Sequence, residues 1–428
     1  MENSRVRSRI GVLSRHFTLL HEANFDLYTV LLRGVQLKHG DAEIEEAEAV
    51  VIGGMVLDVH ATPSFPANPR TTTPGKVYYV LGGVARNVAE CMSKLGKRPY
   101  MISAVGEDMA GNLLMEHWTS AGLSIKGIRK SKGIETAVVC NVFDVKGEVA
   151  AGVASMEAIE KFLTPDWIQQ NKGSICSAPV LMVDANLNLS ALEASCQLAV
   201  ESRRLVWFEP VSVAKSRKIT GVVQYVTFAS PNEDELIAMA NALSDENVFH
   251  PLEKDSRDNY SIVSLLHMLK PAIWVLLEKG IKIVVLTLGS DGVFLCTKGG
   301  PSFMRMPLVK TKQHGSLYQT VIQSCPSNLY SVASEANRSS HLFAVHFPSL
   351  PASVVRVTGA GDCLVGGTIA SICAGLDIMQ GVAVGIAAAK AAVEAETNVP
   401  FLFSLAAIAD DARTVYSAAK VVFHQSML

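Results

Sequence analysis

The sequence predicts an α/β fold, a doubly wound and mostly parallel sheet that is covered by helices. Short apolar runs of strand type, such as Val180–Asp184 and Ile283–Leu288, alternate along the chain with longer stretches of helical periodicity. Such alternation is typical of parallel strands that are buried on both faces. Hydrophobic residues make up 49% of the 428 residues, which is enough for a large core.

Composition excludes several classes of protein. Lys and Arg number 38 and Asp and Glu number 40, a net charge of −2, which argues against nucleic acid as the main partner. The eight cysteines include no C-x-x-C pair, so neither a zinc ribbon nor a redox motif is visible, and their use points to a reducing compartment. No segment reaches the roughly 18 apolar residues that a membrane helix needs, so we expect no membrane partner.

The elements follow one another in a simple order. We expect residues 1–48 to form an N-terminal extension, which ends in the acidic run 41–48, and the α/β domain to cover 49–403. Residues 297–353 lack periodicity and are expected to be an insertion, and 404–428 a C-terminal helix and tail. Expected strands are Ala49–Gly54, Pro99–Val105, Ala137–Asp144, Val180–Asp184, Leu205–Glu209, Tyr225–Ala229 and Ile283–Leu288; expected helices are Asn87–Leu95, Asn112–Ala121, Ser190–Glu201, Glu233–Leu243 and Ser261–Lys279.

The strongest chemical motif is Thr358-Gly-Ala-Gly-Asp362, which follows the apolar run Val354–Val357 and precedes a long helical pattern. Glycines at such a junction let backbone amides point into one space, where the helix adds its positive end, and this makes an anion hole. An Asp in the same turn can take a proton from a hydroxyl group. A glycine-rich helix start capped by Asp362 explains the same string.

Two further motifs suit the binding of hydroxyl groups. In Leu81-Gly-Gly-Val-Ala-Arg-Asn87 the glycines allow close approach of a ligand, and the Asn87 amide can both donate and accept. Asp58 follows the first strand, at the edge where open α/β sheets bind ligands. A turn with an exposed Asn and an ordinary turn Asp are the alternative readings.

Two motifs later in the chain suit a nucleotide and a metal ion. Asn232-Glu-Asp-Glu235 places two oxygen ligands at a helix start, where they suit Mg²⁺, although an acidic first turn also complements the helix dipole. Thr287-Leu-Gly-Ser-Asp-Gly292 ends a buried strand and suits contact with a nucleotide phosphate, although a hairpin turn has the same sequence. The chain contains no P-loop motif and no protein-kinase signature.

In combination and order, these motifs and Val105-Gly-Glu-Asp-Met-Ala-Gly111 resemble the pfkB, or ribokinase-like, family of carbohydrate and nucleoside kinases over residues 49–400. The resemblance implies a small β lid, from residues 58–80 and 134–155, and ATP with Mg²⁺ as cofactors. It also implies a role for each motif. Asp362 is then the catalytic base beside an anion hole of Gly359, Ala360 and Gly361; Asn232 and Glu235 orient hydrated Mg²⁺; Thr287, Gly289, Gly292 and Asn232 belong to the ATP site; and Asp58, Gly82, Gly83 and Asn87 bind the sugar.

Finer details narrow the implied substrate. Gly82–Ala89, Asp184–Leu187 and Glu209–Ser212 resemble the versions in family members that act on pseudouridine. The implied reaction moves the γ-phosphoryl group of ATP to the 5′-hydroxyl of pseudouridine, with Thr136 and Asn186 as candidate contacts to the base. Another nucleoside or sugar kinase of the family, ribokinase-like or fructokinase-like, is the alternative.

The resemblance has limits and rivals. Arg356 stands where ribokinases carry an Asp that helps to bind a monovalent cation, so the resemblance does not extend to potassium activation through that position. Family members often dimerise through their lids, which makes a homodimer an expectation here. A catalytically dead binding protein conflicts with the intact Asp362, and a nicotinamide-dependent oxidoreductase conflicts with a first turn, 53–58, that lacks G-x-G-x-x-G.

Both ends of the chain carry targeting patterns. Arg9–Phe17 fits a type-2 peroxisomal nonapeptide, and Ser426-Met-Leu428 resembles the C-terminal tripeptide S-K-L, with Met427 in place of the basic residue. A basic tail or an organelle transit peptide explains the first pattern as well. We expect recognition by a peroxisomal import receptor and a peroxisomal location, with the cytoplasm as the alternative.

Overall fold

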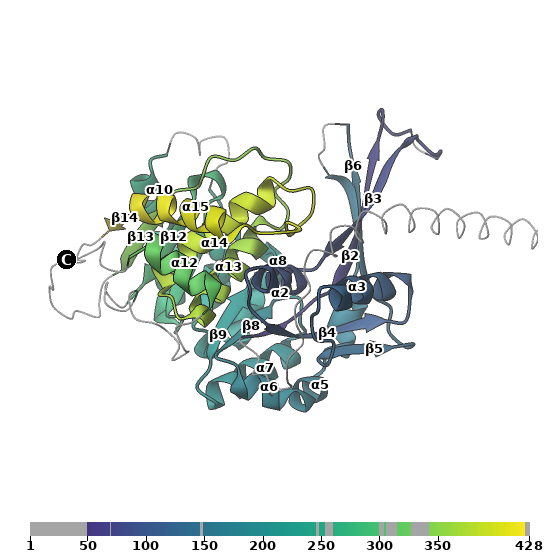
Figure 1. The fold of residues 1–428 in the computed structure, drawn as a ribbon, viewed down its shortest axis with the longest axis horizontal. Coiled ribbons are helices and arrows are strands. Elements are labelled where there is room, and N and C mark those ends of the chain that lie inside the picture. Colours follow the sequence, from purple (N-terminus) through teal and green to yellow (C-terminus); the bar gives the residue numbers. More distant parts are fainter. Residues whose placement is uncertain are drawn as a thin grey trace, which may run out of the picture. The chain divides into compact units, whose positions relative to one another are not determined.

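A ten-stranded sheet runs through the described part of the chain (Figure 1). The computed structural model describes residues 49–68, 70–145, 149–244, 248–252, 260–298, 304, 315–326 and 342–423, all within one compact unit, Glu46–Leu428. The strand order is β14-β13-β12-β11-β10-β9-β8-β1-β4-β5. Neighbours from β11 to β5 are parallel, and β12, β13 and β14 are added antiparallel at one edge. The strands are β1 (Ala49–Ile52), β4 (Pro99–Gly106), β5 (Ile128–Ser131), β8 (Val180–Asp184), β9 (Leu205–Glu209), β10 (Phe228–Ala229), β11 (Ile283–Thr287), β12 (Val293–Thr297), β13 (Phe343–Phe347) and β14 (Lys420–Phe423).

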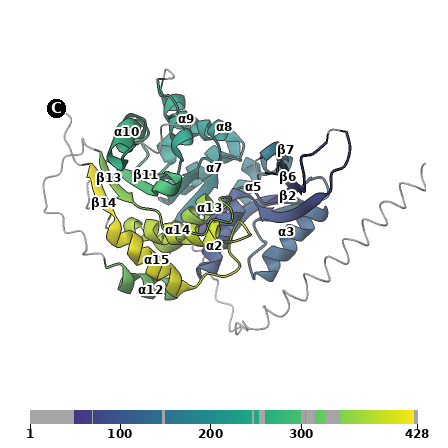
Figure 2. The same cartoon turned by 90° about the horizontal axis from the view of Figure 1, so that it is seen from above.

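Helices cover both faces of this sheet, as the view from above shows (Figure 2). Successive side chains of a strand point to opposite faces, so Val51 and Met182 enter one core while Val50 and Leu181 enter the other. The first core contains α2 (Val84–Lys94), α3 (Met109–Ser120), α12 (Ser316–Ser324), α13 (Ala360–Ala374), α14 (Ile378–Val393) and α15 (Leu405–Ala418). The second contains α4 (Glu157–Phe162), α5 (Pro165–Gln170), α6 (Lys172–Ser177), α7 (Leu189–Glu201), α9 (Glu233–Leu243) and α10 (Ile262–Glu278). Short helices complete the set: α8 (Val213–Ser216), η1 (Arg217–Gly221), η2 (Val223–Tyr225) and η4 (Gly289–Asp291).

A second, four-stranded sheet has the order β3-β2-β6-β7. Its strands are β2 (Val56–Pro63), β3 (Gly75–Gly82), β6 (Ala137–Phe143) and β7 (Val149–Ser155). β2 pairs antiparallel with β3 and parallel with β6, which brings two segments far apart in the sequence side by side. We call this sheet the lid. Its strands fall in or close to the two segments, 58–80 and 134–155, in which the resemblance places lid pieces.

The predicted fold class is confirmed: a mostly parallel α/β sheet with a separate small sheet. The edge beyond β11 differs from expectation. The supposedly irregular residues 297–353 include α12 and β13, and the expected tail contains β14, which pairs with β13. The targeting patterns at 9–17 and 426–428 lie outside the described residues. Within the described residues, no helix is long and apolar enough to cross a membrane.

The close crossing of α13 and α14 depends on glycine. A Cβ atom added to Gly385 of α14 would lie 2.4 Å from the carbonyl oxygen of Leu364 in α13, and one added to Gly367 would lie 2.9 Å from the Gly385 Cα atom. Neither contact is possible without backbone movement. Because α13 carries Asp362 in its first turn, this crossing helps to fix the position of that residue.

We expect Gly385→Ala to lower the free energy of unfolding by about 1–3 kcal/mol, the usual cost of overpacking a core. Urea denaturation followed by circular dichroism measures the change. Gly173→Ala is the matched control, because Gly173 lies within α6 and a Cβ atom there meets nothing within 4 Å. The control should be neutral or stabilising by up to about 1 kcal/mol. Equal stability of the two variants would show that the crossing tolerates a side chain.

Candidate active site

The start of α13 is the place for which the sequence predicts an anion hole, and of the three predicted amides that of Ala360 already donates to the carbonyl oxygen of Val357 at 3.3 Å. Gly359 precedes the helix in the left-handed conformation, with φ of 88°, and a Cβ atom there would lie 2.2 Å from the carbonyl oxygen of Asn398. The helix begins at Ala360, so Gly361 and Asp362 belong to its first turn. First-turn N–H groups have no intrahelical acceptor, and the helix dipole makes this end positive.

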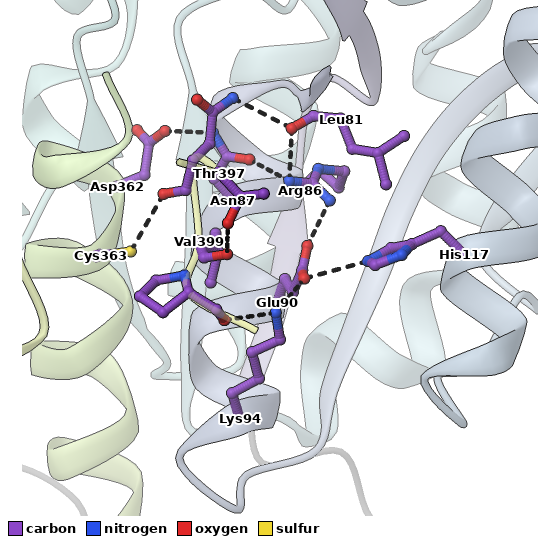
Figure 3. Close-up of polar contacts among 12 residues, drawn as sticks. Leu81, Arg86, Asn87, Glu90, Lys94, His117, Asp362, Cys363, Thr397 and Val399 are labelled. Atoms are coloured by element: carbon purple, nitrogen blue, oxygen red, sulfur yellow. Dashed lines mark hydrogen bonds and ion pairs between the residues drawn. The ribbon is translucent and has the colours of Figure 1, made fainter. Parts of the chain in front are cut away.

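Asn87 reaches this turn from the other glycine motif. Its Nδ2 atom donates a 2.6 Å hydrogen bond to Oδ2 of Asp362, although the two residues are 275 positions apart (Figure 3). Gly83 begins the turn before α2 with φ of 98°, and a Cβ atom there would lie 2.3 Å from the carbonyl oxygen of Gly54. The Gly-Gly pair therefore lets α2 begin close to the turn that follows β1, and Asn87 faces α13.

Asp58 lies on β2 of the lid. A Cβ atom on Gly82 would lie 2.2 Å from Oδ2 of Asp58, so the glycine leaves the space that the carboxylate fills. Burial raises the pKa of Asp58 to about 6, against a hydrogen bond from Asn398 and the charges of Arg86 and Arg356, which lower it.

Asp362 has a similar electrostatic environment. Burial raises its pKa to about 6, while the hydrogen bond from Asn87 and the charge of Arg86 lower it, and Asp184 and Asp58 raise it. A carboxylate with a pKa near 6 is ionised at neutral pH and basic enough to accept a proton from a hydroxyl group during a reaction.

The second group of predicted residues lies at the ends of β10 and β11. Asn232 and Glu235 form a capping box on α9: the Glu235 N–H donates to Asn232 Oδ1 at 2.8 Å, and the Asn232 N–H donates to Glu235 Oε2 at 2.9 Å. Thr287 lies beside them, because its N–H donates to the carbonyl oxygen of Pro231 at 2.9 Å and it forms a bridge with Asn232. The motif therefore starts a helix, as the alternative interpretation of the sequence expects. The Oε1 atom of Glu235 takes no part in the capping box.

Glu209 connects the two groups and was not among the predicted site residues. Burial raises its pKa well above the ordinary value, the hydrogen bond from Ser230 lowers it, and the charges of Glu235 and Asp362 raise it further. Glu209 thus interacts electrostatically with Glu235 and Asp362, although the described residues contain no group of three or more acidic, His or Cys side chains that could share a metal ion. Mg²⁺ binds proteins through one or two carboxylates together with water and substrate phosphates, so the predicted pair of Asn232 and Glu235 fits a hydrated Mg²⁺ better than Glu209, whose raised pKa favours the neutral acid. The sequence signal for Glu209 was its place at the end of a strand, before a Pro.

The two glycines of the Thr287 motif differ in their surroundings. Gly292 has φ of 93°, and a Cβ atom there would lie 2.1 Å from the carbonyl oxygen of Phe347 on β13. Gly289 has φ of 61° and meets nothing within 4 Å. Gly292 is thus required by packing against the sheet edge, while Gly289 faces open space that a ligand can approach.

Thr136 and Asn186 are both buried and already bonded within the protein. The Thr136 hydroxyl donates to Oδ1 of Asp108 at 2.7 Å and accepts from the Gly106 N–H at 2.8 Å, which ties the lid to the start of α3. The Asn186 side chain accepts a hydrogen bond from Lys215. Their predicted contact with a nucleobase stays a prediction.

The apolar run Val354–Val357 forms a loop. The N–H groups of Val355 and Arg356 both donate to the carbonyl oxygen of Val393, the last residue of α14. The Arg356 guanidinium donates to the carbonyl oxygen of Glu396 at 2.8 Å and lies 3.2 Å from Nδ1 of His60 on the lid. Arg356 therefore brings a positive charge to the loop before the anion hole.

The fold and these groups together define a phosphotransferase of the ribokinase-like class, and comparison with known proteins agrees. Residues 46–314 match the model of the pfkB family of carbohydrate kinases. The chain belongs to this family, whose members are kinases that phosphorylate an alcohol group.

Individual relatives narrow the likeness. The chain is 53% identical over 382 residues to a pseudouridine kinase from Arabidopsis thaliana, covering 89% of this chain and 100% of the relative. A pseudouridine kinase from Escherichia coli (strain K12) is 25% identical over 264 residues, 62% of this chain and 77% of the relative. Among solved structures, an Arabidopsis thaliana ribokinase complexed with ribose and ATP superposes with a TM-score of 0.64 at 17% identity, covering 86% of this chain and 99% of that one.

The raised pKa of Asp362 predicts a stability effect with a defined sign. Since its pKa is about 6 in the fold and 3.8 ordinarily, the folded state binds more protons between these pH values, so the stability contribution of Asp362 decreases as pH rises from about 4 to about 6. Asp362→Asn does not titrate. We therefore expect its Tm, relative to that of the unmodified chain, to be higher at pH 7.5 than at pH 4.

Thermal unfolding at both pH values measures this difference. Glu135→Gln, which changes an exposed carboxyl group, is the control for the general effect of removing a negative charge. A Tm difference for Asp362→Asn that is the same at pH 4 and pH 7.5 would contradict the burial of charge at Asp362.

Proposed function

We propose that the chain transfers the γ-phosphoryl group of ATP to the 5′-hydroxyl of pseudouridine and forms pseudouridine 5′-phosphate. The observation that carries this proposal is the meeting of Asn87 and Asp362 at 2.6 Å, beside Asp58 and the positive end of α13. It joins a group that binds hydroxyls, a base and an anion hole in one place. The 53% identity to a pseudouridine kinase supports the choice of nucleoside.

Each residue has a separate task in this reaction. Asp58 and Asn87 hold the ribose hydroxyls, and Asp362 accepts the proton of the 5′-hydroxyl as its oxygen attacks the γ-phosphorus atom. The first-turn amides of α13 face the negative charge of the transferring group. Orientation of the two reactants supplies much of the acceleration, because the transferred group needs little other chemistry from the protein.

Asn232 and Glu235, at the start of α9, are the proposed place for hydrated Mg²⁺, which would neutralise charge on the phosphates of ATP. Asn232 and Thr287 fix the start of α9 beside the end of β11, so Glu235 keeps its position. Gly289 offers its open side to the nucleotide. ADP is the expected second product.

A substrate panel tests the proposed function. ADP formation is measured with pseudouridine, uridine, ribose and fructose, and we expect kcat/KM to be highest with pseudouridine. Equal or better turnover of uridine or ribose would overturn the choice of substrate and favour another sugar or nucleoside kinase of the family.

Asp362→Asn is the companion variant in the same assay. Because the base is lost while the binding groups remain, we expect kcat to fall by about 10²–10⁴-fold with little change in KM. Retained turnover in this variant would show that Asp362 is not the base.

Two further proposals concern the setting of the enzyme. We propose peroxisomal import through the patterns at 9–17 and 426–428, which a fluorescently tagged chain and versions with either pattern altered would test in cells.

A homodimer through the lid is supported by exposed apolar side chains on both outer strands, Val77 and Tyr78 of β3 and Val153 of β7. Light scattering of the unmodified chain and of Val153→Asp tests it.

A further inference from the structure

We propose that Arg86 is a positioning residue for the catalytic base, which it serves by fixing the orientation of the Asn87 amide. This inference rests on the proposed function and extends it, because the proposed reaction assigns Arg86 no contact with the phosphates or with the sugar. Arg86 is 2% exposed and lies in the first turn of α2, next to Asn87 in the sequence (Figure 3).

The guanidinium of Arg86 makes three contacts at once. Its Nη2 atom donates to Oδ1 of Asn87 at 2.5 Å and to the carbonyl oxygen of Leu81 at 2.9 Å, and its Nη1 atom donates to Oε2 of Glu90. The planar fork of a guanidinium can satisfy three acceptors in fixed directions, whereas an ammonium group is a flexible point donor. Arg86 therefore holds Asn87, the end of β3 and its own helix together.

These contacts decide which way the Asn87 amide faces. A guanidinium only donates hydrogen bonds, so the atom of Asn87 that faces Arg86 must be the oxygen. The NH₂ group is then directed to the other side, where it donates to Asp362. A donor in this position favours the ionised form of Asp362, which is the form that accepts a proton.

Glu90 holds Arg86 in place from the far side. Its Oε1 atom accepts hydrogen bonds from Nζ of Lys94 at 2.5 Å and from Nε2 of His117 on α3 at 3.1 Å. Burial alone would raise the pKa of Glu90, but Arg86, His117 and Lys94 lower it well below its ordinary value. A buried ion pair with several further partners is suited to fixing geometry, since breaking it would leave a buried charge alone.

Arg86 also acts on the base through its charge. Four charged or titratable groups act electrostatically on Asp362: Arg86 from α2, Asp58 from the lid, Asp184 from β8 and Glu209 from β9. Among these ionisable groups, Arg86 is the cation, and it lowers the pKa values of both Asp362 and Asp58. Charge and orientation can be separated by choosing the substitution.

Three variants make the test. Arg86→Gln removes the charge and the fork, and we expect the acidic limb of kcat/KM to move up by about one pH unit, so that activity at pH 5.5 falls about tenfold more than at pH 8. Arg86→Lys keeps the charge and loses the fork, so kcat should fall while the acidic limb stays near its original pH. Lys94→Gln is the matched control: it removes a cation from Glu90 without touching Asn87, and its pH profile should stay unchanged.

A readout without substrate separates this inference from the proposed function. Titration of the ¹³C-labelled Asp362 carboxyl group, assigned by its absence in Asp362→Asn, should show a higher midpoint in Arg86→Gln than in the unmodified chain. The comparison remains valid even if the chain prefers another nucleoside. Arg86→Gln with Glu90→Gln, which leaves no buried charge alone, provides the same measurement if the single variant does not fold. An unchanged Asp362 midpoint and acidic limb in a folded variant would overturn the proposal.

Discussion

The hydrogen bond between Asn87 and Asp362 is the contact on which the rest of the site depends. It joins two helix starts that the sequence separates by 275 residues, and it is possible only where both helices begin within reach of each other. Gly83 and Gly359 make this approach possible, because a Cβ atom at either position would clash with a neighbouring carbonyl oxygen. Asp362, the proposed base, is consequently placed by backbone packing first and by side chains second.

The same constraint spreads outward through both helices. α13 keeps its place because Gly367 and Gly385 let α14 cross it closely. The buried pair of Arg86 and Glu90 ties α2 to its surroundings, through the bond from Arg86 to the Leu81 carbonyl oxygen and the bond from His117 of α3 to Glu90. Gly367 and Gly385 leave room where the backbones of α13 and α14 cross. The ion pair between Arg86 and Glu90 fixes the orientation of the Arg86 side chain. A hydrophobic core alone would hold the helices together without choosing the orientation of an amide.

Much of this arrangement could be predicted from the sequence, and the limits have physical causes. Parallel strands such as Val180–Asp184 and Leu205–Glu209 were located at their observed bounds, since buried apolar runs carry a clear signal. β13 and β14 were missed because each is short and its partner is distant in sequence, so no local pattern marks the pair. Asp362 and Asn87 were found from glycine motifs, whereas Arg86 and Glu209 act through contacts that only the folded chain creates. Asn232 and Glu235 were found, but their reciprocal cap shows that one motif can serve the helix and still leave an oxygen for a ligand.

The charge of the chain takes on a different meaning in this light. A net charge of −2 excludes a broad basic surface, yet the site must hold ATP, a strong anion. The proposed site meets this need locally, with the amides at the start of α13 rather than with an excess of Lys and Arg. Burial has the opposite effect on the carboxylates: it raises the pKa values of Asp58 and Asp362 to about 6, which disfavours their charge in the folded state. That unfavourable energy is the consequence of placing the carboxyl group of the proposed base in partly buried surroundings, so the environment that raises the pKa of Asp362 acts against the stability of the fold.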